Sequence, residues 1–225
     1  MADNRLLLAT NNAHKARELR RLLGHLPLEL VTPADLGLRL EPAEDGATFE
    51  ANALAKARAF TDASGLPALA DDSGIEVDAL SGRPGVHSAR YGGPGLTDPE
   101  RVTLLLRELA HVPEGERTAR YRAVLAVAAP AHGSTVPPIP GSGARIERTA
   151  EGSCEGTVAW APDGTNGFGY DPVFFVAARG ATMARLTDEQ KDAISHRGNA
   201  ARAIAPILAA WPVAPLAPDV TRARS

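Results

Sequence analysis

The stretch Leu69-Ala-Asp-Asp-Ser-Gly74 combines an apolar start with two carboxylates, a hydroxyl and a glycine. Together with Ala68, which follows Pro67, its apolar part is typical of a short buried strand. Side chains on a strand alternate between faces, so Asp71 and Asp72 are expected to point in opposite directions. Acidic groups at the end of a buried strand need hydrogen bonds or a metal, because an unpaired buried charge is very costly. The pattern fits either a ligand site or a turn that caps the next element.

The composition narrows the class of protein. The chain has 225 residues, of which 44% are hydrophobic and 23% charged, as in an ordinary globular domain with a core. Its net charge of −3 argues against a general nucleic-acid-binding protein, whose surface would be basic. The single cysteine, Cys154, excludes an intramolecular disulfide and suits a reducing compartment. Because the chain has neither a signal-peptide pattern nor a long apolar run, we expect a cytoplasmic protein that does not bind membranes.

Strand-like and helix-like segments are intermixed along the chain, which predicts an α/β fold with a mixed sheet. Residues 1–211 are expected to form a single domain, and residues 212–225, rich in Pro, Ala and Arg, a flexible tail. The Pro-rich stretch 130–143 is expected to be an exposed loop or hairpin end. Apolar runs predict strands at 5–9, 29–32, 121–129, 155–160 and 173–176, and residues 75–80 could continue the strand of the opening stretch. Helical periodicity predicts helices at 48–63 and 99–110, the first with Thr48 as its cap. Thr187 and Gln190 have the spacing of a capping box at the start of the C-terminal part.

A polar loop, Thr10-Asn-Asn-Ala-His-Lys15, separates the first predicted strand from a helical pattern. Such a loop presents a hydroxyl, amides and free backbone N–H groups at a helix N-terminus, which is a natural anion site. It lacks the glycines of a Walker motif, and a plain helix cap explains the same residues. In the next predicted helix Asn52 and Lys56 lie four residues apart and share a face. Both features suit a negatively charged ligand.

The motifs taken together resemble the inosine triphosphate pyrophosphatase family. The resemblance runs in the family's order from Leu6 to about Leu208 and so covers nearly the whole chain. It implies a central mixed sheet flanked by helices, with two lobes and the active-site cleft between them. The matching motifs are Thr10-Asn11-Asn12 with Lys15, Thr48-Phe49 with Asn52-Ala53 and Lys56-Ala57, Ala70-Asp71-Asp72-Ser73-Gly74 with Ser88-Ala89-Arg90-Tyr91, Gly167-Phe168-Gly169-Tyr170-Asp171-Pro172, and Lys191 with Ser195-His196-Arg197-Gly198.

This resemblance implies a hydrolase that cleaves ITP, dITP and XTP to the monophosphate and pyrophosphate with the help of Mg²⁺. Asp72 is then the catalytic proton acceptor and a metal ligand, while Asp71 remains as its structural neighbour. Glu44 is the second metal-side carboxylate, with Glu41 as the alternative. The substrate-binding residues implied by the resemblance are Thr10, Asn11, Asn12, Ala13, His14, Lys15, Asn52, Lys56, Ser73, Phe168, Gly169, Tyr170, Asp171, Lys191, His196 and Arg197.

The residue types suit that chemistry. Lysine ammonium groups are mobile point charges that neutralise phosphate oxygens. Hypoxanthine and xanthine carry a carbonyl at position 6, where adenine carries an amino group, so donors from His196 and Arg197 would favour the deaminated bases. Phe168 offers a stacking face, and Asp171 could accept a hydrogen bond from a ring N–H.

Other functions fit parts of the same pattern. A pyrophosphatase for pyrimidine or other modified nucleoside triphosphates would keep the phosphate chemistry and change the base site. A nucleotide-binding module without catalysis would keep the site and lose the reaction. The family is typically homodimeric, so the resemblance also implies a homodimer that takes a purine nucleoside triphosphate as its small-molecule substrate.

Overall fold

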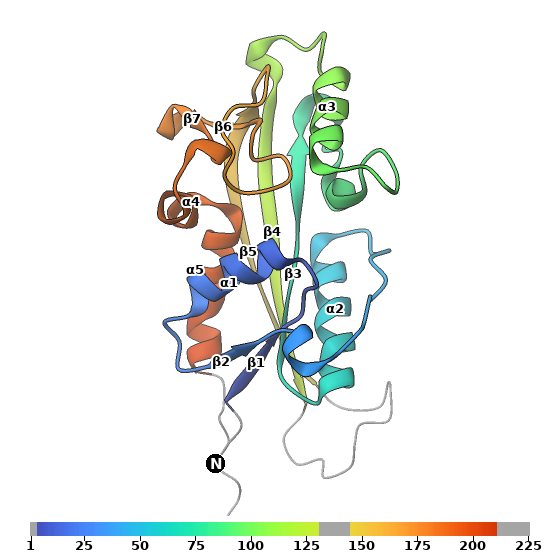
Figure 1. Cartoon of the computed structure of the whole chain (residues 1–225), viewed down its shortest axis with the longest axis vertical. Helices are drawn as coiled ribbons and strands as arrows, with labels where there is room; N and C mark the ends of the chain where they lie inside the picture. Colours follow the sequence, from blue (N-terminus) through green and yellow to red (C-terminus); the bar gives the residue numbers. More distant parts are fainter. Residues whose placement is uncertain (1–3, 131–144, 211–225) are drawn as a thin grey trace, which may run out of the picture.

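The computed structural model describes residues 4–130 and 145–210, which form a mixed sheet covered by helices (Figure 1). The sheet has seven strands in the order β2-β1-β3-β4-β5-β6-β7. β1 is parallel to β2 and β3, and the other neighbouring strands are antiparallel. The predicted α/β fold with a mixed sheet is therefore confirmed. The strands are β1 (Arg5–Leu8), β2 (Glu29–Val31), β3 (Ala68–Val77), β4 (Thr118–Pro130), β5 (Arg145–Val158), β6 (Phe174–Val176) and β7 (Ala181–Thr182).

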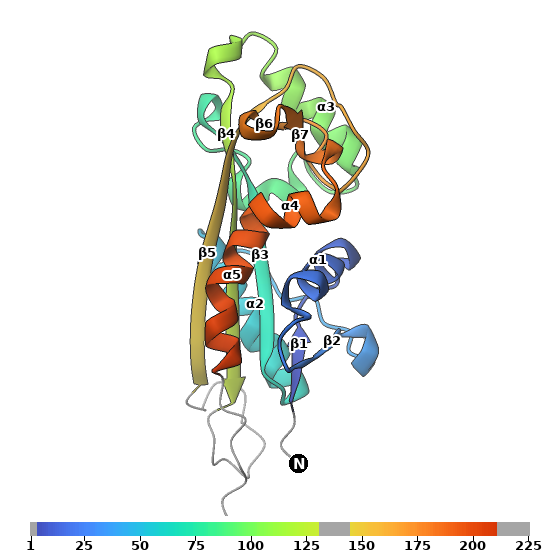
Figure 2. The same cartoon turned by 90° about the vertical axis from the view of Figure 1, so that its left-hand side faces the viewer.

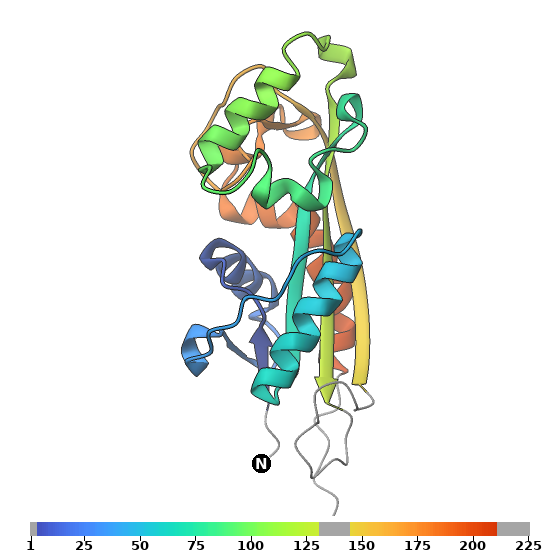
Figure 3. The same ribbon diagram turned by 90° about the vertical axis from the view of Figure 1, so that its right-hand side faces the viewer.

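The helices divide the molecule into two lobes that share the long strands β3, β4 and β5 (Figures 1 and 2). In the β1 lobe, α2 packs on one face of the sheet and α1 and α5 on the other (Figure 3). The α3 lobe holds α3, α4, β6 and β7 around the far half of the long strands. The helices are α1 (Ala13–Leu23), α2 (Phe49–Ser64), α3 (Asp98–Glu108), α4 (Asp188–Ile194) and α5 (His196–Ala209).

Side-chain caps determine where three of these helices begin. The Thr48 hydroxyl accepts the N–H of Ala51 at 3.1 Å and starts α2, as its position in the sequence predicts. Thr187 and Gln190 form the predicted capping box at the start of α4. Asn12 caps α1 by accepting the N–H groups of the next turn. The polar loop before α1 therefore contains a helix cap, and this cap is compatible with an anion site in the same loop.

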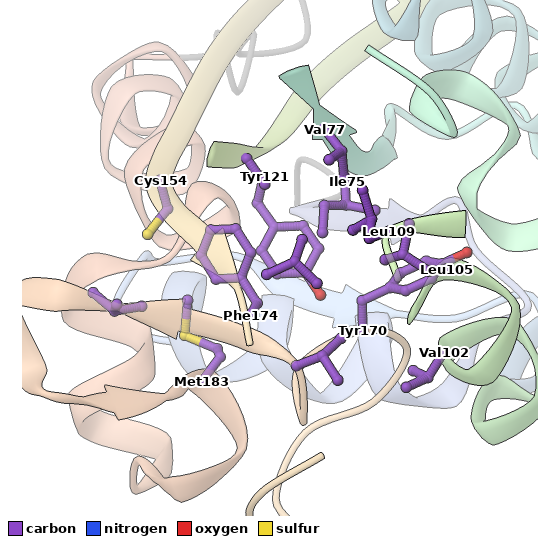
Figure 4. Close-up of a cluster of buried hydrophobic side chains, with 14 of the residues drawn as sticks. Ile75, Val77, Val102, Leu105, Leu109, Tyr121, Cys154, Tyr170, Phe174 and Met183 are labelled. Atoms are coloured by element: carbon purple, nitrogen blue, oxygen red, sulfur yellow. The ribbon is translucent and has the colours of Figure 1, made fainter. Parts of the chain in front are cut away.

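The α3 lobe is held by a hydrophobic cluster in which aromatic side chains from β4 and β6 meet aliphatic side chains from β3 and α3 (Figure 4). The rings of Tyr121 and Phe174 lie 4.4 Å apart at an interplanar angle of 42°, a favourable tilted arrangement. Ile75 and Leu105 are fully buried beside them. This cluster packs against the C-terminal half of β3 and so stabilises the α3 lobe.

Two strands differ from the sequence expectation. Asp71 and Asp72 lie within β3 rather than at a strand end: they pair with Leu125 and Val124 of β4, and the strand runs on to Val77. β5 begins at residue 145, ten residues before the predicted start, because its polar residues are held by pairing along the whole of β4. Only the first residue of the Pro-rich stretch 130–143, and none of the tail 212–225, lies within the described residues. Among the helices described, none is long and apolar enough to cross a membrane.

The α3-lobe core predicts a difference between adjacent phenylalanines of β6. Phe174 is fully buried in the cluster, whereas Phe175 points to the other face and is half-buried. Phe174→Ala should lower the free energy of unfolding by about 3–5 kcal/mol, because it leaves a cavity. Phe175→Ala should cost clearly less in the same urea titration. Equal losses would contradict this packing.

Candidate active site

The alternation of side chains on β3 sends its two aspartates to different helices. The Asp72 carboxylate faces α2, where it accepts hydrogen bonds from Asn52 Nδ2 at 3.1 Å and from Lys56 Nζ at 2.8 Å. Burial raises the pKa of Asp72, and the Lys56 ammonium opposes that increase. The raised pKa makes Asp72 a better proton acceptor than an exposed aspartate.

Asp71 faces the opposite side of the sheet, toward α1 and α5. Its carboxylate lies 2.5 Å from Lys15 Nζ and accepts hydrogen bonds from Arg197 Nε and Ser73 Oγ, each at 2.9 Å. Although burial disfavours its charge, Arg197 and Lys15 hold the pKa of Asp71 well below its usual range. The surroundings of Asp71 therefore favour its ionised form, whereas burial of Asp72 favours its protonated form.

The sheet topology leaves the edge of β3 at Asp71 and Asp72 without a neighbouring strand on the β1 side. β1 pairs with β3 only as far as Leu69 and then turns into the polar loop before α1. From β1 the chain passes through α1 to β2 on one side, and from β2 through α2 to β3 on the other, with the two helices on opposite faces. Ligands of α/β sheets bind at such a switch point, outside the carboxyl ends of the strands.

A cleft of about 450 Å³ occupies this position, between the β1 lobe and the turn η3 (Gly85–Arg90). Eight of the predicted metal and substrate residues line it, namely Thr10, Asn11, Asn12, Lys15, Glu44, Lys56, Asp72 and Ser73. Glu41, the alternative to Glu44, lines it as well.

Two cations and one carboxylate form the wall of the cleft beside Asp72. Lys56 Nζ lies 3.2 Å from Glu44 Oε1 and 2.8 Å from Asp72 Oδ1, so both carboxylates face one positive charge. Arg90 donates to the Glu44 backbone carbonyl at 2.6 Å and lies 3.7 Å from its carboxylate. Sequence reasoning gave Arg90 no role, although it lies in the Ser88–Tyr91 motif. Its position in the cleft depends on η3, which no periodicity indicates.

A second set of predicted residues lies behind the cleft, around a buried carboxylate that sequence reasoning missed. Glu18 Oε1 is 2.8 Å from Lys191 Nζ, and its Oε2 accepts a hydrogen bond from Arg197. Lys191 also donates to Asp171 Oδ2 at 2.6 Å. Despite burial, Arg197 and Lys191 lower the pKa of Glu18 to about 2. A charge beside Leu19 on the apolar stripe of α1 was the signal that could have identified it.

The guanidinium of Arg197 is fully engaged in this arrangement. It donates to Asp71, Glu18 and the Ser73 hydroxyl, and the residue is 1% exposed. His196 is also buried, and its ring stacks on Tyr121 with centroids 4.5 Å apart. Burial lowers the pKa of His196 well below its usual value, so the ring is neutral at pH 7. Its Nδ1 is buried and has no hydrogen-bond partner within the described residues.

The loop at 167–171 places its residues in different surroundings. The Phe168 ring is half-buried and lies 5.2 Å from the His14 ring and 5.2 Å from Lys191 Nζ. Gly169 donates its N–H to Asp98 of α3 at 2.9 Å. The Tyr170 side chain is in the α3-lobe core, and its hydroxyl donates to the Ser88 carbonyl. The predicted residues that do not line the cleft are Ala13, His14, Asn52, Phe168, Gly169, Tyr170, Asp171, Lys191, His196 and Arg197.

The donor set at the cleft suits a hard divalent cation that brings other ligands with it. Asp72 and Glu44 provide carboxylate oxygens that already converge on the Lys56 ammonium. Within residues 4–130 and 145–210, no group of three His, Cys, Asp or Glu side chains is arranged to hold a metal ion. Mg²⁺ typically binds one or two carboxylates and completes its shell with substrate phosphates and waters, so these residues fit Mg²⁺.

Fold and cleft together define an α/β protein with a polar, charged cleft at a strand switch point. Comparison with known proteins makes the class specific: the chain matches the model of the Ham1 family over residues 6–207. The chain belongs to the Ham1 family, and the resemblance drawn from its motifs is confirmed.

Relatives span nearly the whole chain. It is 47% identical over 196 residues to a protein of Geobacter sulfurreducens named dITP/XTP pyrophosphatase, covering 87% of this chain and 92% of that one. A Thermus thermophilus protein of the same name is 48% identical over 201 residues, or 89% of each chain. A solved HAM1 protein from Coxiella burnetii has a TM-score of 0.76 and 36% identity, covering 91% of this chain and 98% of that one.

The contribution of Glu18 to the free energy of unfolding should depend on pH. Its pKa is about 2 in the folded chain against an ordinary 4.5, so its contribution to stability is complete above pH 4.5 and is lost as the pH falls toward 2. Glu18→Gln should lower the free energy of unfolding by roughly 3 kcal/mol at pH 7, and by about 2 kcal/mol less at pH 3. Urea titrations at both pH values measure this.

The matched control is Glu114→Gln, which changes an exposed glutamate of the α3 lobe. It should leave unfolding unchanged at both pH values. A Glu18→Gln deficit that stays constant between pH 7 and pH 3 would contradict the ionised ion-pair role of Glu18.

Proposed function

We propose that this protein is a Mg²⁺-dependent pyrophosphatase that hydrolyses non-standard purine nucleoside triphosphates, such as ITP, dITP and XTP, to the monophosphate and pyrophosphate. The observation that carries the proposal is the arrangement of Asp72, Glu44 and Lys56 in a cleft that Lys15 also lines, in a chain of the Ham1 family. The names of its Geobacter and Thermus relatives, dITP/XTP pyrophosphatase, support the same substrate class.

The phosphate end of the substrate belongs at the start of α1. Asn12 already caps the helix, so Thr10 and Asn11 hold polar groups at the cleft while Lys15 provides a positive charge. Lys56 and Arg90 add positive charge from the opposite wall. Phosphoryl transfer requires mainly positioning and charge stabilisation, which these groups provide.

Asp72 takes the proton from the attacking water. Its pKa is raised by burial, and Asn52 and Lys56 fix the carboxylate in one orientation. Attack at the α-phosphorus then releases pyrophosphate in one step. Asp72 and Glu44 would hold Mg²⁺, which when bound neutralises phosphate charge.

The base end belongs near His196 and Phe168, behind the phosphate end. The neutral His196 ring has a buried Nδ1 free for a hydrogen bond to the base. Arg197 is held by Asp71 and Glu18, so it contributes to base recognition by maintaining a positive charge there. Positive charge and donors favour the carbonyl at position 6 over the amino group of adenine.

The homodimer and the cytoplasmic location remain part of the proposal. The family resemblance supports the first, and the single Cys154, buried and unpaired, supports the second. Light scattering coupled to size exclusion measures the oligomeric state directly.

A product assay tests the proposed reaction. Incubation with ITP and Mg²⁺ should yield IMP and pyrophosphate, and removal of Mg²⁺ by a chelator should stop the reaction. UTP and ATP at the same concentration should react much more slowly. Release of orthophosphate with IDP, or no turnover, would contradict the proposed function.

Asp72→Asn tests the catalytic role. The substitution retains the shape of the side chain but removes the proton acceptor, so kcat should fall by about 10²–10⁴-fold with a much smaller change in ITP affinity. Asp78→Asn is the matched control, because Asp78 follows the same strand and pairs with Arg120 at the surface. It should retain the parent activity. Binding without any activity in the parent would instead indicate a nucleotide-binding module.

A further inference from the structure

One face of α1 makes three contacts with the α3 lobe. The contacting residues are four and then three positions apart, so they form a single stripe along the helix. The first contact is between aromatic rings, the second is a buried ion pair, and the third is a two-pronged exposed ion pair. The stripe consists of His14, Glu18 and Arg21, whose partners in the α3 lobe are Phe168 for His14, Lys191 for Glu18, and Asp188 and Asp192 for Arg21.

The ring contact is the weakest of the three and lies closest to the cleft. Glu18 and Arg21 hold the α3 lobe by charged hydrogen bonds at 2.8–2.9 Å. The His14 ring only lies against the Phe168 ring, with centroids 5.2 Å apart and an interplanar angle of 30°. His14 is exposed and follows the polar loop that lines the cleft. A ligand can therefore separate the rings while the two ion pairs keep the lobes aligned.

Hydrogen bonds orient the His14 ring and fix the backbone at Phe168. An Arg17 guanidinium nitrogen lies 2.8 Å from His14 Nδ1, and because arginine can only donate, this nitrogen is the acceptor and Nε2 carries the hydrogen. Phe168 donates its N–H to Asp171 at 2.9 Å, and the next residue is bonded to Asp98 of α3. The orientation of the His14 ring and the position of the Phe168 backbone are therefore set before a ligand binds.

We propose that His14 and Phe168 are the two walls of a slot for the purine base, and that His14 is a base-stacking, specificity-determining residue; this inference rests on the proposed function. Carbon atoms in contact lie roughly 3.5–4.0 Å apart, so a base between the rings needs their centroids roughly 7 Å apart. The rings have to separate by about 2 Å from the 5.2 Å of the free form. One tilted ring contact is then replaced by two stacked ones.

The slot divides base recognition between two kinds of contact. Stacking depends on ring area and tolerates any base, so two walls favour the larger purine over a pyrimidine. Hydrogen bonding near His196 then distinguishes the carbonyl at position 6 from an amino group. Selection for a purine and selection for a deaminated base consequently depend on different residues.

Steady-state kinetics with ITP test the slot. His14→Ala should raise KM by about 5–10-fold, because a stacked base loses one wall, and should leave kcat within about twofold of the parent. His14→Phe should retain the parent KM, since it keeps an aromatic ring. His25→Ala, which removes an exposed histidine just beyond α1 and outside the cleft, should match the parent.

Inhibition by inorganic pyrophosphate separates the base slot from the adjacent phosphate loop. Because pyrophosphate has no base, its inhibition constant should be unchanged in His14→Ala. A rise in that constant parallel to KM, an unchanged KM in His14→Ala, or a His14→Phe variant as weak as His14→Ala would each overturn the proposal. A parent that releases no pyrophosphate from ITP would contradict the proposed function instead, and calorimetric binding of ITP to the same variants would then decide the slot.

Discussion

The site depends on one constraint: side chains of β3 alternate at the point where its neighbour β1 stops pairing. Alternation gives Asp71 to the face of α1 and α5 and Asp72 to the face of α2. Because the pairing with β1 stops at Leu69, the strand edge beside both carboxylates is open to a ligand. A strand with carboxylates at its centre is stable only if each finds a cation. α1, α2 and α5 provide those cations.

The charges on the α1 and α5 face of β3 form a continuous alternating series that runs from Lys15 at the cleft to Lys191 behind it. Asp71 joins Lys15 to Arg197, and Glu18 joins Arg197 to Lys191. Every cation in this series is already desolvated and paired in the folded chain. Nucleotide binding therefore does not have to supply the free energy of desolvating these cations. The Asp72 side differs, because burial there raises the pKa of the carboxylate. The paired charges on one face of β3 stabilise the scaffold, and the carboxylate on the other face is the one that the proposed reaction uses.

The sequence predicts those features that depend on local pattern. The mixed α/β fold, the cap at Thr48 and the capping box at Thr187 follow from periodicity and spacing, and the opposite directions of Asp71 and Asp72 follow from strand geometry. It does not predict the length of β5, whose polar residues are held by long-range pairing with β4. Nor does it predict that Glu18 is the centre of a buried ion-pair cluster, because only tertiary packing brings Arg197 to α1.

In the proposed division of roles, Asp71 stabilises the fold while Asp72 serves the reaction. The most direct measurement is the free energy of unfolding of Asp71→Asn and Asp72→Asn, determined by urea titration at pH 7. Asp71→Asn should lose roughly 3–5 kcal/mol, because it removes the partner of Lys15 and one of the two carboxylate partners of the buried Arg197. Asp72→Asn should be as stable as the parent or more so, since burial already disfavours its ionised form. Equal losses, or a larger loss in Asp72→Asn, would contradict this division of roles.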